Sequence, residues 1–171
     1  GISMWSAQKN TRELLGANAE FAVRSLVRET RRRLAPVRQA NAYITRLIDS
    51  GQIDLDEPET LGETLLTAMA GTNQVFGMAF IYPDGKSIRV RRGRGVLPPG
   101  SVNDITSNLQ AITEARSKYQ PYWGKPLWIE QIKSTVISIR TPIREGENLR
   151  GILVSVVTVN ALSKFIARSG A

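Results

Sequence analysis

Two β-rich segments, residues 74–82 and 86–92, are joined by the tripeptide Pro-Asp-Gly at 83–85, and this pair constrains the fold most. An Asp-Gly pair between two such segments predicts an antiparallel hairpin with a tight turn. The first segment is apolar at successive positions, so both of its faces are covered. The return segment alternates Ile88 and Val90 with arginines, which predicts one face toward water or a polar cavity.

The remaining segments alternate between helical and extended patterns. Apolar residues at steps of three and four predict helices, and short apolar runs between turn residues predict strands. The expected helices are residues 9–50, 57–70, 103–118 and 161–167, and the further strands are 127–132, 135–143 and 150–159. Neither the hairpin nor the last three strands is stable alone, so they share one sheet. The sequence therefore predicts an α+β domain built on a five-stranded antiparallel sheet.

Residues 1–50 form the N-terminal part of the chain, and its long helix is expected to pack on one face of that sheet. Pro36 lies inside its apolar pattern and predicts a kink or break, because proline removes a donor and clashes with the preceding turn. Residues 51–171 form the sheet-containing domain, and the two parts together are expected to be one structural unit. A helix of this length suits a signalling strut or a dimer seam.

The chain contains no cysteine and no histidine. The commonest general base, the thiolate nucleophile and the usual ligands of zinc are therefore all missing. Neither a phosphate-binding Walker loop nor a Gly-x-Ser-x-Gly elbow is present in the sequence. We expect a non-catalytic protein with no metal site and no cofactor.

The net charge of +8 is concentrated in residues 24–38 and 89–94. Nucleic acid, an anionic membrane surface and an acidic ligand would all suit this charge, and so would a solvated helix face. The arginines are split between a distant helix and a loop, and the sequence has no ribonucleoprotein, KH or zinc-finger signature. Nucleic acid is therefore not the expected partner, although a basic nucleic-acid-binding domain stays as an alternative.

Three segments resemble the PAS-like sensor domains known as Cache or PDC domains: residues 34–55, 74–85 and 139–163. The third contains a Pro-Ile pair, a glycine turn, an apolar strand and a Leu-Ser pair in the family's usual order. The combination most resembles sensor regions that precede bacterial adenylate or guanylate cyclase domains. The Arg-x-Trp-Tyr motif of amino-acid-binding double Cache domains is missing, so that ligand class is not carried over.

The resemblance implies a small-molecule-sensing domain in the periplasm, the extracytoplasmic part of a bacterial membrane receptor. It also implies flanking membrane helices outside this segment, signalling by movement of the first helix, and a homodimer formed through that helix. Some domains of this fold act only as spacers or dimerisation units without a ligand. That alternative stays open at the level of sequence.

In this family the ligand lies between one face of the sheet and the loops and helix that follow the second strand. The candidate ligand-binding residues in that region are Tyr82, Arg89, Trp123, Trp128 and Arg140. Arg140 stands in a strand of Val, Ile, Ser and Thr, where its planar guanidinium suits a carboxylate, so an anionic ligand is favoured. The alternatives are an exposed arginine on a sheet edge and tryptophans that only pack a loop.

Overall fold

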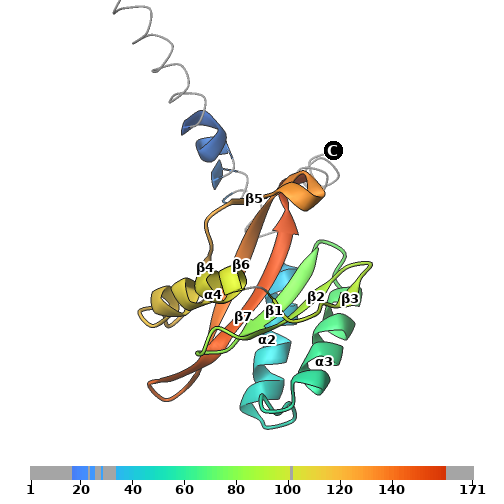
Figure 1. The fold of residues 1–171 in the computed structure, drawn as a ribbon, viewed down its shortest axis with the longest axis vertical. Coiled ribbons are helices and arrows are strands. Elements are labelled where there is room, and N and C mark those ends of the chain that lie inside the picture. Colours follow the sequence, from blue (N-terminus) through green and yellow to red (C-terminus); the bar gives the residue numbers. More distant parts are fainter. Residues whose placement is uncertain (1–16, 23, 26–27, 29–33, 101, 161–171) are drawn as a thin grey trace, which may run out of the picture.

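The computed structural model describes residues 17–22, 24–25, 28, 34–100 and 102–160 (Figure 1). The helices are α2 (Ala35–Asp49), α3 (Pro58–Ala70) and α4 (Val102–Ala115), with a short 3-10 helix, η1 (Glu130–Ile132). The strands are β1 (Gly77–Ile81), β2 (Ser87–Arg91), β3 (Gly95–Val96), β4 (Tyr122–Trp123), β5 (Leu127–Ile129), β6 (Ser134–Glu145) and β7 (Asn148–Thr158). The predicted α+β class is confirmed.

All strands join one antiparallel sheet in the order β3-β2-β1-β7-β6-β4, and β5 also pairs with β6. The five predicted strands all form, and two more of two residues each, β3 and β4, make seven. Both additions come from the Gly- and Pro-containing stretches 93–101 and 120–126, whose composition predicts irregular structure. They pair at the margins of the sheet, where a short ladder tolerates such residues.

The hairpin closes as the Asp-Gly pair predicts. The amide of Tyr82 donates to the carbonyl of Lys86 at 2.8 Å, and Gly85 has a φ of +87°. A Cβ atom at Gly85 would lie 3.0 Å from Ile105 and Leu109 of α4, so the turn also packs closely against that helix. Glycine is therefore required there for conformation and for space.

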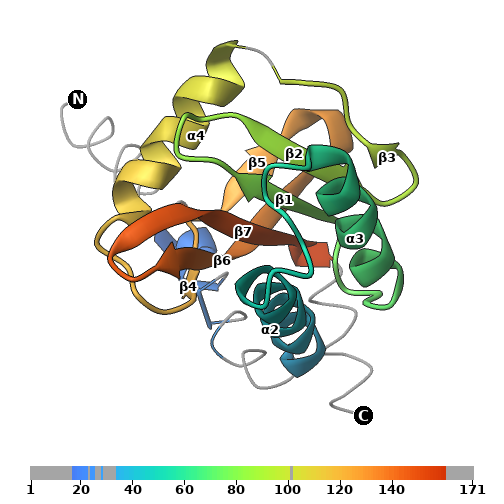
Figure 2. The same cartoon turned by 90° about the horizontal axis from the view of Figure 1, so that it is seen from below.

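One face of the sheet is covered by α2 and α3, which lie side by side (Figure 2). We call this side of the sheet the sealed face. Its core residues are at most 1% exposed and include Ile44 and Leu65 of the helices and Phe80, Ile137 and Leu153 of the sheet. Hydrophobic burial of this kind is the main force that holds helices on a sheet.

The other face carries α4 on part of its area (Figure 2). Ala111, Ile112 and Ala115 of α4 pack on Ile81 and Ile152. The helical spacing predicts Ile105 and Leu109 on the buried side together with Ile112 and Ala115, but they are 37% and 42% exposed, so this prediction is wrong for both. The helix instead turns Asn108 inward, because this amide bonds to Arg89 and to the hairpin turn. We call this side of the sheet the cavity face.

Proline and glycine mark the helix ends. Leu34 lies in a turn, and α2 begins at Ala35. Pro36 is in the first turn of this helix, where the backbone N–H that proline lacks would have no partner within the helix. Gly51, with a φ of +79°, follows the end of α2. Residues 17–22 are helical, but 1–16, 29–33 and the expected last helix at 161–167 lie outside the described residues.

Candidate functional site

A single row of residues crosses four strands on the cavity face. The pairings β2–β1, β1–β7 and β7–β6 place Arg89, Ala79, Val154 and Arg140 opposite one another in that order. Neighbouring strands are about 4.8 Å apart, so the two arginine backbones are separated by roughly 14 Å. Two long cations therefore flank a floor of two small apolar residues.

The next row on the same face has a similar pattern. It places Arg91, Gly77, Val156 and Ser138 opposite one another. Gly77 and Ala79 of the central strand β1 are both small, so their side chains fill little of the space above the sheet. The middle of the sheet is therefore left with free space above it.

That space is a cavity of about 310 Å³. Ser107, Asn108 and Ala111 of α4 form one side, and Lys125, Leu127 and Ile129 of the β4–β5 region form another. Its size lies at the lower end of the range of ligand pockets, which bring a few fixed polar groups together over an apolar lining. Both features fit a small molecule with an apolar part and a polar part.

Arg89 is held in place by side chains beside the cavity. Its Nη2 donates to Oδ1 of Asn108 at 2.7 Å, and its Nε donates to Oγ of Ser87 at 3.2 Å. Burial lowers the pKa of the Arg89 guanidinium below its ordinary value; the carboxylate of Asp104 raises it, and the positive charge of Arg140 lowers it further. The two arginines are thus close enough to repel each other.

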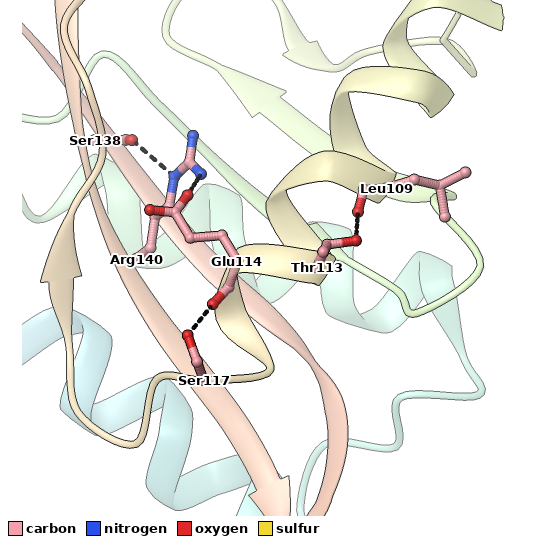
Figure 3. A network of polar contacts seen from close by, with 6 residues as sticks. All are labelled: Leu109, Thr113, Glu114, Ser117, Ser138 and Arg140. Atoms are coloured by element: carbon pink, nitrogen blue, oxygen red, sulfur yellow. Dashed lines mark hydrogen bonds and ion pairs between the residues drawn. The ribbon is translucent and has the colours of Figure 1, made fainter.

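Arg140 lies against β4 and α4 (Figure 3). Its Nε donates to Oγ of Ser138 at 3.3 Å, and its Nη1 lies 3.5 Å from Oε2 of Glu114, whose side chain is 48% exposed. A Cβ atom at Gly124 would come within 2.9 Å of Nε of Arg140, so glycine is needed there to admit the guanidinium. The Arg140 side chain is only 24% exposed.

Tyr122 pairs with Arg140 across the β4–β6 ladder. Its hydroxyl is buried and lies close to the Arg140 guanidinium, although no hydrogen bond between them meets the usual geometric limits. Burial raises the pKa of this hydroxyl, while the nearby positive charge of Arg140 lowers it to a smaller extent. Tyr122 is therefore a neighbour of Arg140 that stands outside the lining of the cavity.

The charge around the cavity has one sign. Arg89, Arg91, Lys125 and Arg140 all line it, and no Asp or Glu is among the described residues that do so. The guanidinium of Arg91 also lies 4.9 Å from the centre of the Phe76 ring. Glu114, the acidic group paired with Arg140, stands on α4 outside the lining.

The structure brings two of the five sequence-predicted residues, Arg89 and Arg140, to this cavity and places the other three elsewhere. Tyr82 packs on Phe80 at the sealed face and donates to the carbonyl of Leu55 at 2.6 Å. Trp123 also packs against the core of the sealed face. Trp128 is 54% exposed and donates to Glu130 at 2.8 Å.

Each of these three aromatic residues is one position away from a residue on the cavity side. Ile81 and Leu127 line the cavity, and Tyr122 packs on the core of the cavity face. Successive side chains of a strand point to opposite faces, so a shift by one residue exchanges the faces. For Tyr82, the register of the hairpin could have predicted the correct face. Arg89 pairs with Ala79, so the odd-numbered residues of β1 share the face of Arg89, and Tyr82 lies on the opposite face.

Residues that sequence reasoning did not select as site residues include Asn108, Ser107 and Lys125. Asn108 is 3% exposed on the inner side of α4, and a polar residue among Ala111, Ile112 and Ala115 is the signal that would have found it. Lys125 carries no comparable signal, because its place depends on how the loop after β4 folds back on β6.

No cluster of three or more acidic residues in the described ranges is arranged to hold a metal ion. Within the same part of the chain, no helix combines the length and apolar character needed to cross a membrane.

No protein-family model and no curated protein matches this sequence. Solved structures do match. The sensory domain of the Campylobacter jejuni chemoreceptor Tlp3 aligns with 96% of this chain at a TM-score of 0.65 and 17% identity, and 65% of that domain is covered. The chain thus spans slightly less than two thirds of that domain.

Two other structures carry the same likeness. The extracellular domain of soHK1S-Z6, assigned as a histidine kinase, has a TM-score of 0.61 and 19% identity over 96% of this chain and 66% of its own. The ligand-binding domain of the Pseudomonas aeruginosa chemoreceptor PctC, bound to GABA, has a TM-score of 0.53 and 12% identity over 93% of this chain and 64% of its own. The PAS-like fold that the Cache resemblance implied is confirmed: this chain has the fold of the sensory domains of bacterial chemoreceptors.

Proposed function

We propose that this chain is a small-molecule-sensing domain from the extracytoplasmic part of a bacterial membrane receptor, and that it is not an enzyme. The ligand binds in the cavity beside α4, between Arg89 and Arg140. Its binding is passed to the helices that lead out of the domain. The fold supports this proposal, because the structures of like fold are sensory or ligand-binding domains by name.

The observation that carries the proposal is the pair of arginines across a small apolar floor. Arg89 and Arg140 share one row of the sheet, line the same cavity and repel each other. Like charges in a partly buried site are costly unless a counter-charge is present. An anionic ligand between them would supply that counter-charge and would gain charge-assisted hydrogen bonds.

Strand β7 offers a path from the cavity to the sealed face. Val154 and Val156 lie on the cavity floor, and Ser155 between them points the other way. The hydroxyl of Ser155 donates to Oδ1 of Asn41 in α2, and both side chains are buried. The Nδ2 of Asn41 has no hydrogen-bond partner among the described residues. A ligand that moves Val154 and Val156 would therefore also move Ser155, which is hydrogen-bonded to α2.

The wider setting belongs to the same proposal. We expect a periplasmic domain flanked by membrane helices, a homodimer formed through the N-terminal helix, and an output domain such as an adenylate or guanylate cyclase. The sequence resemblance supports the cyclase, and the structural likeness to receptor domains supports the membrane setting.

A thermal-shift screen against small acids, amines, amino acids and sugars tests this function. A ligand present at about 100 times its dissociation constant stabilises the folded state by roughly 2.7 kcal/mol, or about 5 to 10 °C for a domain of this size. Arg140→Ala should abolish the shift. Arg150→Ala is the matched control, because Arg150 pairs with Glu145 at the β6–β7 turn, away from the cavity.

The two arginine variants separate the possible results. A shift that survives unchanged in Arg140→Ala contradicts the site. A screen in which no compound stabilises the wild-type domain contradicts ligand sensing and favours the spacer or dimerisation role.

A further inference from the structure

We propose that the cavity takes a small carboxylate with a short apolar body and rejects α-amino acids. This inference rests on the proposed function, and it names the ligand class of the same site. It sets this chain apart from structures of the same fold that were solved with L-valine or isoleucine.

The first step is the charge of the lining. Arg89, Arg91, Lys125 and Arg140 line the cavity, and no described lining residue is acidic. An α-amino acid carries its ammonium group on the carbon next to the carboxylate. A carboxylate held by either arginine would therefore bring an ammonium group against a lining with four cationic side chains and no acidic one, since Glu114 and Asp104 act on the arginines from outside that lining.

The second step concerns neutral acceptors, which could also hold an ammonium group. Asn108 uses its Oδ1 for Arg89 and its Nδ2 for the carbonyl of Gly85. The Oγ of Ser138 already accepts from Arg140. Both acceptors thus already face an arginine, and no described lining residue supplies the opposite charge that a buried cation needs.

The third step is the apolar part of the ligand. The floor between the arginines is Ala79 and Val154, and Leu127 and Ile129 stand at the side. The volume of about 310 Å³ equals roughly ten water molecules at about 30 Å³ each. A body of a few carbon atoms would replace that water over apolar surface, which a bare inorganic anion cannot do.

Matched pairs of compounds that differ only by the amino group test this inference. The probes are 3-methylbutanoate against L-valine and hexanoate against L-norleucine, with 3-methylbutanamide and inorganic phosphate as uncharged and inorganic references. Binding to the wild-type domain is measured by isothermal titration calorimetry and by thermal shift at pH 7 and low salt. We expect each carboxylate to bind at least tenfold more tightly than its amino acid and more tightly than either reference.

A variant pair ties that preference to the cavity. Asn108→Asp adds a carboxylate beside Arg89 without a change of size and should weaken binding of 3-methylbutanoate at least tenfold. Asn148→Asp makes the same substitution at the exposed β6–β7 turn and should leave binding unchanged. Both variants are compared at temperatures where their unfolding curves show them to be folded.

The results separate the two proposals. If L-valine or L-norleucine binds as tightly as its carboxylate partner and needs Arg140, the sensor function stands and the inference is overturned. If neither series binds while another compound of the wider screen does, the inference is also overturned. Only a wild-type domain that no compound of the wider screen stabilises contradicts the proposed function itself.

Discussion

The two faces of the sheet are built from alternate residues of the same strands, yet they differ in almost every physical respect. The sealed face packs large aliphatic and aromatic side chains under α2 and α3, with core residues such as Phe80 and Leu153 fully buried. The cavity face has Ala79 and Val154 in the corresponding places, with an arginine on either side. Stability is therefore expected to reside mainly on one face and binding on the other.

The substitution Phe80→Ala tests whether the sealed face carries the stability, and it has the largest expected effect. The ring is 0% exposed and packs edge-on against Tyr82 with centroids 4.9 Å apart, so its removal leaves a cavity in the sealed core. We expect a loss of about 3 to 5 kcal/mol in the free energy of unfolding, measured by urea denaturation. A loss below about 1 kcal/mol would show that the sealed face does not carry the stability.

Arg144 tests whether a charged side chain on the cavity face can contribute to the stability of the fold. Its guanidinium donates to carbonyls of Ala115, Arg116 and Lys118 at the end of α4 and lies 4.2 Å from the centre of the Tyr119 ring. We expect Arg144→Ala to cost about 2 kcal/mol by the same assay, because these carbonyls lose a charged donor. Arg116→Ala removes an equal charge and should cost less than about 0.5 kcal/mol.

Ala79→Leu sharpens the comparison at the position next to Phe80. The larger side chain points into free space on the cavity floor, so we expect the free energy of unfolding to change by less than about 1 kcal/mol. Binding of 3-methylbutanoate should be lost in calorimetry, since the added carbons occupy its place. Retained binding would show that the ligand lies elsewhere.

The smallest expected effect on stability is that of Glu114→Gln. The ion pair with Arg140 spans 3.5 Å and its carboxylate is half-exposed, so its loss should change the free energy of unfolding by less than about 0.5 kcal/mol. Glu114 competes with a ligand carboxylate for Arg140, and its removal should tighten 3-methylbutanoate binding about two- to fivefold. Weaker binding in this variant would mean that Glu114 positions Arg140 for the ligand.

Local patterns predicted much of the fold. The Asp-Gly turn, the five main strands and the helices α3 and α4 all follow from residues that are close in sequence. The two-residue strands β3 and β4 were missed, because they exist only through pairing with β2 and β6. For the site, Arg89 and Arg140 were selected by residue type, while Asn108 and Lys125 depend on how α4 and a loop dock on the sheet.

The sequence by itself determined that β1 and β7 are covered on both faces and that arginines interrupt β2 and β6. Only the tertiary structure decided that Arg89 and Arg140 share one row, since that depends on the register of β1 with β7, pairing Ala79 with Val154. Those residues are far apart in the chain, and both strands are apolar on both faces, so local sequence does not fix the register. Packing against the helices fixes it, and a slip of β1 by one residue against β7 would turn Tyr82 to the opposite face.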